Sequence, residues 1–325
     1  MFLIILQNLF LASTFTLGKA AMEYAQPVFF VGMRMLLGGL LLLGYQYFFN
    51  YSKWRLDKKD IGDFVQMVFF HIAISFGCEF WALQYASASK VAFLWNLAPF
   101  VTALIAYFYC SEKITFKQWI GLSIGFLGML PVLLTSDSTE LASGSFSFLS
   151  MAEIVLFVGI ISGSYAWFIM KRLVTDKGYS TIMVNGVAMF FGGMVDMLAS
   201  LIIEPTPYIT LVPRFGQHCD TTIANMFCQV LPQDYLGVGL LAIYTILLVL
   251  VANVFYFNLY GYLLNYYSNT FISFCGFTIP LFAVLLDWLF VGEVVSRWFF
   301  LAVFIVSIGL YIFYQDELTA KPKKS

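Results

Sequence analysis

The sequence predicts an all-α integral membrane protein, with ten transmembrane helices arranged as two inverted five-helix repeats. Three observations lead to this prediction. Of the 325 residues, 61% are hydrophobic and 11% are charged, whereas a soluble domain carries roughly 25% charged residues. Apolar runs close to the ~20 residues that cross a hydrocarbon core recur along the whole chain. A block of the first half also returns in the second half at a constant spacing.

Ten apolar runs follow one another with short polar breaks between most of them. They cover residues 2–18, 28–49, 64–86, 88–110, 116–135, 152–170, 180–203, 235–262, 267–290 and 296–314. The first run has no basic leader and no small-residue cleavage motif, so we interpret it as a retained helix and not as a signal peptide.

A fixed spacing relates the two halves. Pro280 follows Pro99 by 181 residues, and Glu293 follows Glu112 by the same number. Self-similarity of this kind indicates a duplicated unit. We therefore predict a first repeat at 1–135, a linker at 136–151 and a second repeat at 152–320 that contains a long outer loop at 204–234. Because five is an odd number, the second repeat enters the membrane from the opposite side, which is typical of transporters that expose a central site alternately to each face.

The distribution of basic residues predicts the orientation. Twelve Lys and Arg residues fall on the side of the two termini, and only Lys19, Lys90, Arg214 and Arg297 fall on the other. Positive charge is retained on the cytoplasmic side. We expect both termini in the cytoplasm of a bacterium, with the protein in the inner membrane.

Two stretches of the chain carry a family resemblance. Residues 82–134 and 265–313 each contain a small-residue helix start, a mid-helix Pro, a helix-ending Glu and a following Gly-rich helix. Together they resemble the EamA-type branch of the drug/metabolite transporter superfamily, in which an Arg at the place of Arg34 is common. The resemblance implies a ten-helix carrier with a central cavity, which uses neither ATP nor another cofactor. Lys90 and the long segment 204–234 depart from the family pattern.

The two prolines point to the site. Pro99 and Pro280 lack an N–H and displace the carbonyls of Trp95 and Gly276, so each predicts a kink near mid-membrane. Interrupted helices at matching places in two halves indicate a transporter's central site, although such kinks also serve packing alone. Asn96 lies beside the first kink and is our first candidate for substrate binding.

Ionisable residues inside the spans are costly and are therefore functional candidates. Arg34, Glu79 and Asp196 fall at a similar depth in their helices, which permits an ion pair between Arg34 and Glu79. Lys90 either reaches the outer headgroups or meets a substrate anion at the cavity mouth. His71 shares a helix with Glu79 and is a candidate proton relay, with a hydroxyl-bonded core histidine as the simpler alternative.

Aromatic residues near these groups predict the type of solute. Trp81 and Trp95 lie near Glu79 and Asn96, and aromatic faces attract cationic centres. We expect a secondary transporter, not an enzyme, for a small polar or zwitterionic metabolite. The resemblance implies that S-adenosylmethionine fits, since superfamily members in intracellular bacteria carry it, and amino acids fit equally well. The alternatives are a nucleotide-sugar or phosphate-ester exchanger, and a membrane protein that binds solute without moving it.

The remaining residues suggest few other partners. The five cysteines and two histidines do not have the spacing of a metal site. Cys219 and Cys228 lie in the long outer segment, where an oxidising compartment would permit a disulfide. The basic loop and tail are explained by topology and lipid headgroups, so nucleic acid is not an expected partner.

Overall fold

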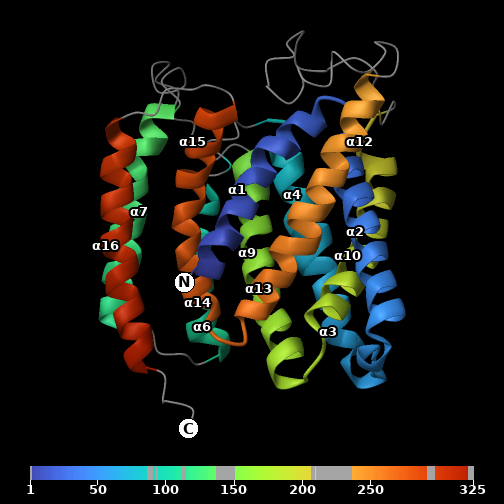
Figure 1. Ribbon diagram of the computed structural model, residues 1–325, viewed down its shortest axis with the longest axis horizontal. Helices are drawn as coiled ribbons and strands as arrows, with labels where there is room; N and C mark the ends of the chain where they lie inside the picture. The colour runs from blue at the N-terminus through green and yellow to red at the C-terminus, as the bar shows by residue number, and fades with distance from the viewer. Residues whose placement is uncertain are drawn as a thin grey trace.

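The computed structural model describes residues 2–85, 91, 94–110, 115–136, 151–205, 209, 236–290 and 297–320. Nearly all of this backbone is helical, and the helices run roughly parallel to one another as a single bundle (Figure 1). The described residues contain no β-strand, only an isolated bridge between Ala25 and Ile209. Lys90, Cys219 and Cys228 lie outside the described residues, as do most of the predicted linker and outer loop.

Seven helical stretches within the described residues are long and apolar enough to cross a membrane. They are Phe2–Met22, Pro27–Phe49, Lys58–Ala82, Met151–Asp176, Thr181–Ile203, Gly237–Leu263 and Asn269–Leu286. Helix is also present within each of the other three predicted spans. The chain is therefore an all-helical, multi-pass membrane protein, while the number ten remains a prediction.

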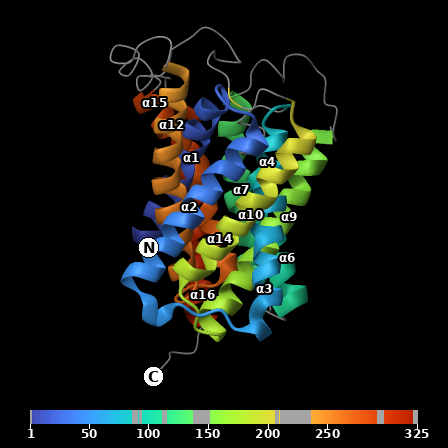
Figure 2. The same cartoon turned by 90° about the vertical axis from the view of Figure 1, so that its right-hand side faces the viewer.

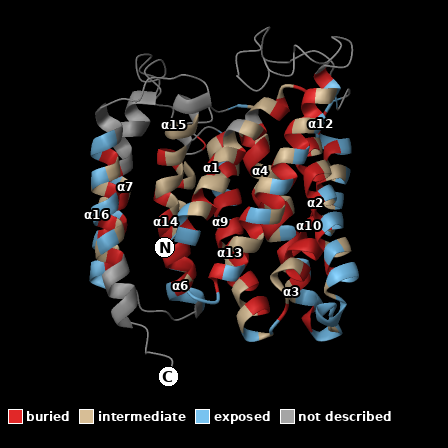
Figure 3. Ribbon diagram, viewed as in Figure 1, coloured by how far each residue is buried: buried red, intermediate tan, exposed pale blue. Residues whose placement is uncertain are grey.

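The outer surface of the bundle suits lipid. Leu37, Leu40 and Leu41 on helix α2 (Pro27–Phe49) are 41%, 49% and 55% exposed. Exposed leucine side chains are unfavourable in water and favourable in the hydrocarbon of a membrane. Figure 3 shows exposed residues on the outward sides of the peripheral helices and buried residues on their inward sides. The buried core includes Phe30, Phe257 and Phe271, each under 2% exposed.

Two long stretches contain an eight-residue π-helical segment in their middle. In the first half, η3 (Met67–Ile74) lies between α3 (Ile61–Gln66) and α4 (Ser75–Ala82). In the second half, η6 (Val249–Tyr256) lies between α12 (Leu236–Leu248) and α13 (Phe257–Leu263). π-helical turns are rare and are frequent at functional sites.

Two further stretches are broken near their middle. A turn at Asn96 and Leu97 precedes α6 (Ala98–Cys110). In the second half a 3₁₀ turn, η7 (Gly276–Thr278), separates α14 (Asn269–Cys275) from α15 (Ile279–Phe290). Pro99 and Pro280 therefore each occupy the second position of the helix that follows a break, where a missing N–H costs little.

Two pairs of helices pack most extensively: α2 with α10 (Thr181–Ile203), and α7 (Phe116–Ser136) with α16 (Arg297–Ala320). The members of each pair lie side by side in Figures 1 and 2. Glycines permit this approach. A Cβ on Gly193 would lie 2.7 Å from the Gly32 carbonyl oxygen, and a Cβ on Gly309 would lie 2.8 Å from the Gly121 carbonyl oxygen. Small residues at membrane helix contacts allow backbones to approach in this way.

The remaining helices contribute the interior between these pairs. Helix α1 (Phe2–Met22) packs against α15, η6 and α12. Helix α9 (Met151–Lys171) packs against α4, η3 and α6 and continues into a π-helical turn, η4 (Arg172–Asp176). The Ser162 hydroxyl donates to the Phe70 carbonyl at 2.7 Å, which joins α9 to η3.

Charged residues tie helices together at one end of the bundle. The Lys177 ammonium lies 2.6 Å from an Asp60 oxygen and 2.7 Å from an Asp63 oxygen. The Tyr179 hydroxyl donates to Asp60 at 2.7 Å, and Arg172 pairs with Asp63. The hydrogen bonds to Asp60 and Asp63 raise the pKa of Lys177. Because the folded state holds this proton more tightly, the stabilisation is complete at neutral pH and is lost only as the pH rises through that raised pKa.

We predict that Gly193→Ala destabilises the protein. The added Cβ would meet the Leu36 amide nitrogen at 2.6 Å, and backbone atoms cannot move aside cheaply. Overpacking of this kind costs about 1–3 kcal/mol. Gly44→Ala on α2 is the matched control, because nothing lies within 4 Å of its Cβ. Thermal unfolding in detergent should show a lower Tm for Gly193→Ala alone, and equal values would contradict the close packing of α2 and α10.

Candidate functional site

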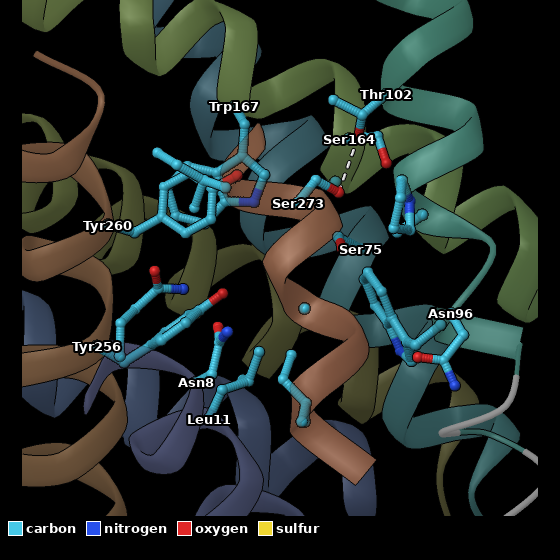
Figure 4. Close-up of a pocket in the computed structure, with 18 of the residues that line it drawn as sticks. Asn8, Leu11, Ser75, Asn96, Thr102, Ser164, Trp167, Tyr256, Tyr260 and Ser273 are labelled. Carbon is cyan, nitrogen blue, oxygen red and sulfur yellow. Dashed lines mark hydrogen bonds between the residues drawn. The ribbon is translucent and has the colours of Figure 1, made fainter. Parts of the chain in front are cut away.

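A central cavity lies where the π-helical segments and the broken helices meet. Its walls come from α1, η3, α4, α6, α9, η6, α13, α14 and α15, so both halves of the chain contribute (Figure 4). The empty space, including its opening, is about 930 Å³. The helix breaks of the two halves therefore border one shared cavity inside the bundle.

Polar groups line one part of the cavity. The Asn8 amide donates to the Cys275 carbonyl at 2.7 Å and to the Thr278 hydroxyl at 2.9 Å. The Thr102 hydroxyl donates to the Ser273 hydroxyl at 3.3 Å, the bond drawn in Figure 4. These bonds join α1 and α6 to the broken helix of the second half. A solute entering here would meet a hydrogen-bonding surface fixed by the protein itself.

Two candidates from the sequence present donors that have no partner among the described residues. The Trp95 indole nitrogen and the Asn96 amide nitrogen are both buried and make no hydrogen bond within this part of the chain, and both residues line the cavity. An unmade hydrogen bond of a buried donor costs about 1–3 kcal/mol. The helix break at Asn96 thus supplies two donors for the acceptor atoms of a bound molecule.

An aromatic wall faces these donors across the cavity. The rings of Trp167 and Tyr260 stack with centroids 3.6 Å apart and planes 18° apart, and Tyr256 lies beside them in Figure 4. All three line the cavity. These three residues were not among the binding candidates predicted from the sequence, although Tyr256 ends the π-helical segment η6. Flat rings arranged in this way bind aromatic rings by stacking and cations by their negative faces.

His71 also lines the cavity, within η3. Its ring lies edge-on to Trp167 at 4.6 Å and to Phe257 at 5.2 Å. Neither ring nitrogen has a hydrogen-bond partner in the protein, so the hydroxyl expected in the simpler interpretation is not bonded to it. No hydrogen bond connects His71 to Glu79 in the described residues, and a proton relay remains a prediction.

Glu79 borders two cavities. It lines the central cavity and also a smaller neighbouring one with about 390 Å³ of empty space, which Arg34 lines as well. The Arg34 guanidinium lies over the rings of Phe80 and Phe76, 4.8 Å and 5.5 Å from their centroids. Among the ion pairs of the described residues, none joins Arg34 to Glu79 within 4.0 Å. The direct ion pair that the sequence permits is therefore not formed between these two described residues.

Trp81 does not line either cavity. Its ring packs against Tyr85, with centroids 4.8 Å apart, and against a small apolar cluster that includes Val101 and Ile160. The two-residue separation from Glu79 turns Trp81 to another face of the helix. Lys90 and the cysteines Cys219 and Cys228 cannot be placed, because they lie outside the described residues. The described part of the chain holds no group of three metal-ligating side chains.

Comparison with known proteins identifies the family. Residues 1–134 match the EamA-like transporter family. The S-adenosylmethionine/S-adenosylhomocysteine transporter of Chlamydia muridarum (strain MoPn / Nigg) is 30% identical over 320 residues, which cover 97% of this chain and 92% of that protein. The chain belongs to the EamA-like transporter family. It is accordingly a transporter, as the resemblance of its two Pro-containing blocks implied.

Further similarities cover all or part of the same length. The transporter with the same description from Chlamydia trachomatis serovar L2 is 29% identical over 97% of this chain and 89% of its own. An uncharacterized transporter of Bacillus subtilis (strain 168) is 21% identical over 63% of this chain and 66% of its own. A crystal structure with 14% sequence identity superposes with a TM-score of 0.72 and covers 98% of both chains. The similarity to known proteins thus extends beyond residues 1–134 to nearly the whole chain.

We predict that the central cavity is accessible to water-soluble reagents. Thr102 and the next residue, Ala103, are both buried, at 2% and 0% exposed, but of the two only Thr102 lines the cavity. In a variant with its five native cysteines replaced, Thr102→Cys should react with a small polar maleimide in permeabilised membranes, and Ala103→Cys should resist it. Equal labelling of the two neighbours would show that the cavity is closed to solvent or that α6 is turned differently.

Proposed function

We propose that this protein is a secondary carrier that moves S-adenosylmethionine, in exchange for S-adenosylhomocysteine, across a bacterial inner membrane. The observation that carries the proposal is one cavity that combines stacked aromatic rings, unpartnered amide and indole donors and a buried carboxylate. The two chlamydial relatives, which match 97% of this chain, are named for these two solutes. A carrier of this family needs no ATP and follows the solute gradients.

The parts of the cavity match the parts of such a solute. Trp167 and Tyr260 offer ring faces for an adenine or for a positively charged sulfonium. Trp95 and Asn96 offer donors for ring nitrogens or for the amino-acid carboxylate. Glu79 offers a negative charge for the ammonium or the sulfonium. Each of these solute groups would find a complementary side chain within one space.

The cavity chemistry argues against an exchanger of anions. Among the described residues that line the two cavities, Arg34 is the one Lys or Arg, and it lies in the smaller cavity. Recognition of a phosphate ester relies on several cations or on backbone N–H groups. An aliphatic amino acid lacks the aromatic ring that the wall of Trp167 and Tyr260 suits, although its ammonium group fits Glu79 equally well.

We further propose that the carrier is built from two inverted five-helix repeats that alternate access to this cavity. Several features support the repeat. The π-helical segments η3 and η6 have the same length and begin 182 residues apart. The helices α6 and α15 begin 181 residues apart, each after a break. The extensive pairs α2 with α10 and α7 with α16 join helices that would correspond in the two repeats.

The proposed orientation places the charged end of the bundle in the cytoplasm. The start of α3, the end of α9 and the end of α16 lie at this same end (Figures 1 and 2). It therefore gathers the basic residues Lys53 to Lys59 and Lys171 to Lys177. The positive-inside rule then assigns it to the cytoplasmic side.

We predict saturable uptake of labelled S-adenosylmethionine by cells that express the chain. Unlabelled S-adenosylhomocysteine should compete and should also accelerate efflux of the label from preloaded cells. Trp95→Ala should lower the affinity by about thirtyfold, because the loss of a buried aromatic anchor costs ~2 kcal/mol. Trp54→Ala, which removes an exposed tryptophan, is the matched control and should leave uptake unchanged. Amino-acid flux without S-adenosylmethionine flux, at equal surface expression, would overturn the proposed substrate.

A further inference from the structure

Three ionisable side chains are buried together behind the central cavity. They come from three different helices: Arg34 from α2, Glu79 from α4 and Asp196 from α10. Their exposed fractions are 2%, 6% and 2%. All three lie within spans that cross the membrane, where charged groups persist only if they compensate one another or serve function.

Asp196 approaches helix α4 at Gly77, where there is no side chain in the way. A Cβ built on Gly77 would lie 3.6 Å from an Asp196 carboxylate oxygen, so this carboxylate faces α4 two residues before Glu79. The Arg34 guanidinium lies against the same helix, over the rings of Phe76 and Phe80. Its Nε and one Asp196 oxygen have no hydrogen-bond partner among the described residues. Among the ion pairs of those residues, none within 4.0 Å fixes this single cation to either acid.

The charges do not cancel. One guanidinium and two carboxylates leave one negative charge over when all are ionised, and such a charge is costly inside a membrane unless a further cation offsets it. Of the two acids, Glu79 borders the central cavity, whereas Asp196 lines neither cavity. If Asp196 offsets Arg34, the negative charge of Glu79 remains available to a solute in the cavity.

We propose that Arg34, Glu79 and Asp196 act as one charge triad through which the carrier distinguishes a solute with one extra positive charge from the same solute without it, and that Asp196 is a specificity-determining residue. The inference rests on the proposed function. S-adenosylmethionine carries a methyl group on a positively charged sulfur, and S-adenosylhomocysteine carries a neutral sulfur in its place. Asp196 acts through Arg34 and touches no solute.

The charge balance of variants tests the triad. Asp196→Asn leaves Arg34 to offset Glu79, so the excess negative charge disappears. The double variant Arg34→Gln/Asp196→Asn removes one charge of each sign and restores the excess. Asp176→Asn is the matched control, because it makes the same chemical change at an exposed position outside the cavity. The measurement is competition for the uptake of labelled S-adenosylmethionine at equal surface expression. For each variant we compare the concentration of unlabelled S-adenosylmethionine that halves this uptake with the concentration of unlabelled S-adenosylhomocysteine that does so, and report their ratio.

We expect the preference for S-adenosylmethionine to fall about tenfold in Asp196→Asn, since buried charges interact more strongly in a low dielectric than in water. The double variant should recover the preference of the original protein, and Asp176→Asn should retain it. Where a variant does not transport, the same ratio is measured by displacement of labelled S-adenosylmethionine from purified protein. Arg34→Gln provides an independent check and should keep or increase the preference.

An unchanged ratio in Asp196→Asn, no recovery in the double variant, or a lower preference in Arg34→Gln would each overturn the triad. These outcomes are separate from failure of the proposed function. If the original protein moves neither solute, the proposed substrate is wrong. If it moves both, and the ratio of the two half-inhibiting concentrations does not change in the triad variants, only the inference about Asp196 is wrong.

Discussion

Hydrocarbon offers no hydrogen bonds, and this constraint determines where the backbone of this protein can depart from a regular helix. An open N–H or carbonyl is tolerated at membrane depth only where protein or a cavity surrounds it. The described breaks obey this limit: the turn at Asn96, the 3₁₀ turn of η7 and residues of both η3 and η6 border the central cavity. The irregular backbone and the binding space are therefore one feature of the fold.

Much of this arrangement could be predicted from the sequence, because hydrophobic length and repeated Pro positions need no tertiary information. Glu79, Trp95 and Asn96 stood out as polar or amphipathic groups inside apolar spans, and all three line the cavity. Trp167 and Tyr260 did not stand out, because 36 Phe, 19 Tyr and 7 Trp leave no local signal that separates a cavity wall from core packing. Trp81 lies near Glu79 in the sequence but lines neither cavity, because two residues close together along a helix do not share one face.

The π-helical segments limited the predictions further. A regular helix turns by 100° per residue, and faces assigned on that basis shift by part of a turn wherever a π-turn intervenes. His71 lies inside η3 and Glu79 follows it, so their relation could not be read from spacing alone. Asp196 was recognised as a buried acid, but its approach to α4 depends on Gly77 and on the packing of α10, which only the folded chain reveals.

The glycine contact between α2 and α10 also has a consequence for biogenesis. Helix α2 leaves the ribosome long before α10, so its glycine seam and Arg34 lack their final partners while the intervening segments are inserted. Arg34 and the glycines of α2 therefore reach their final packing only late in synthesis, when α10 closes against a helix made much earlier.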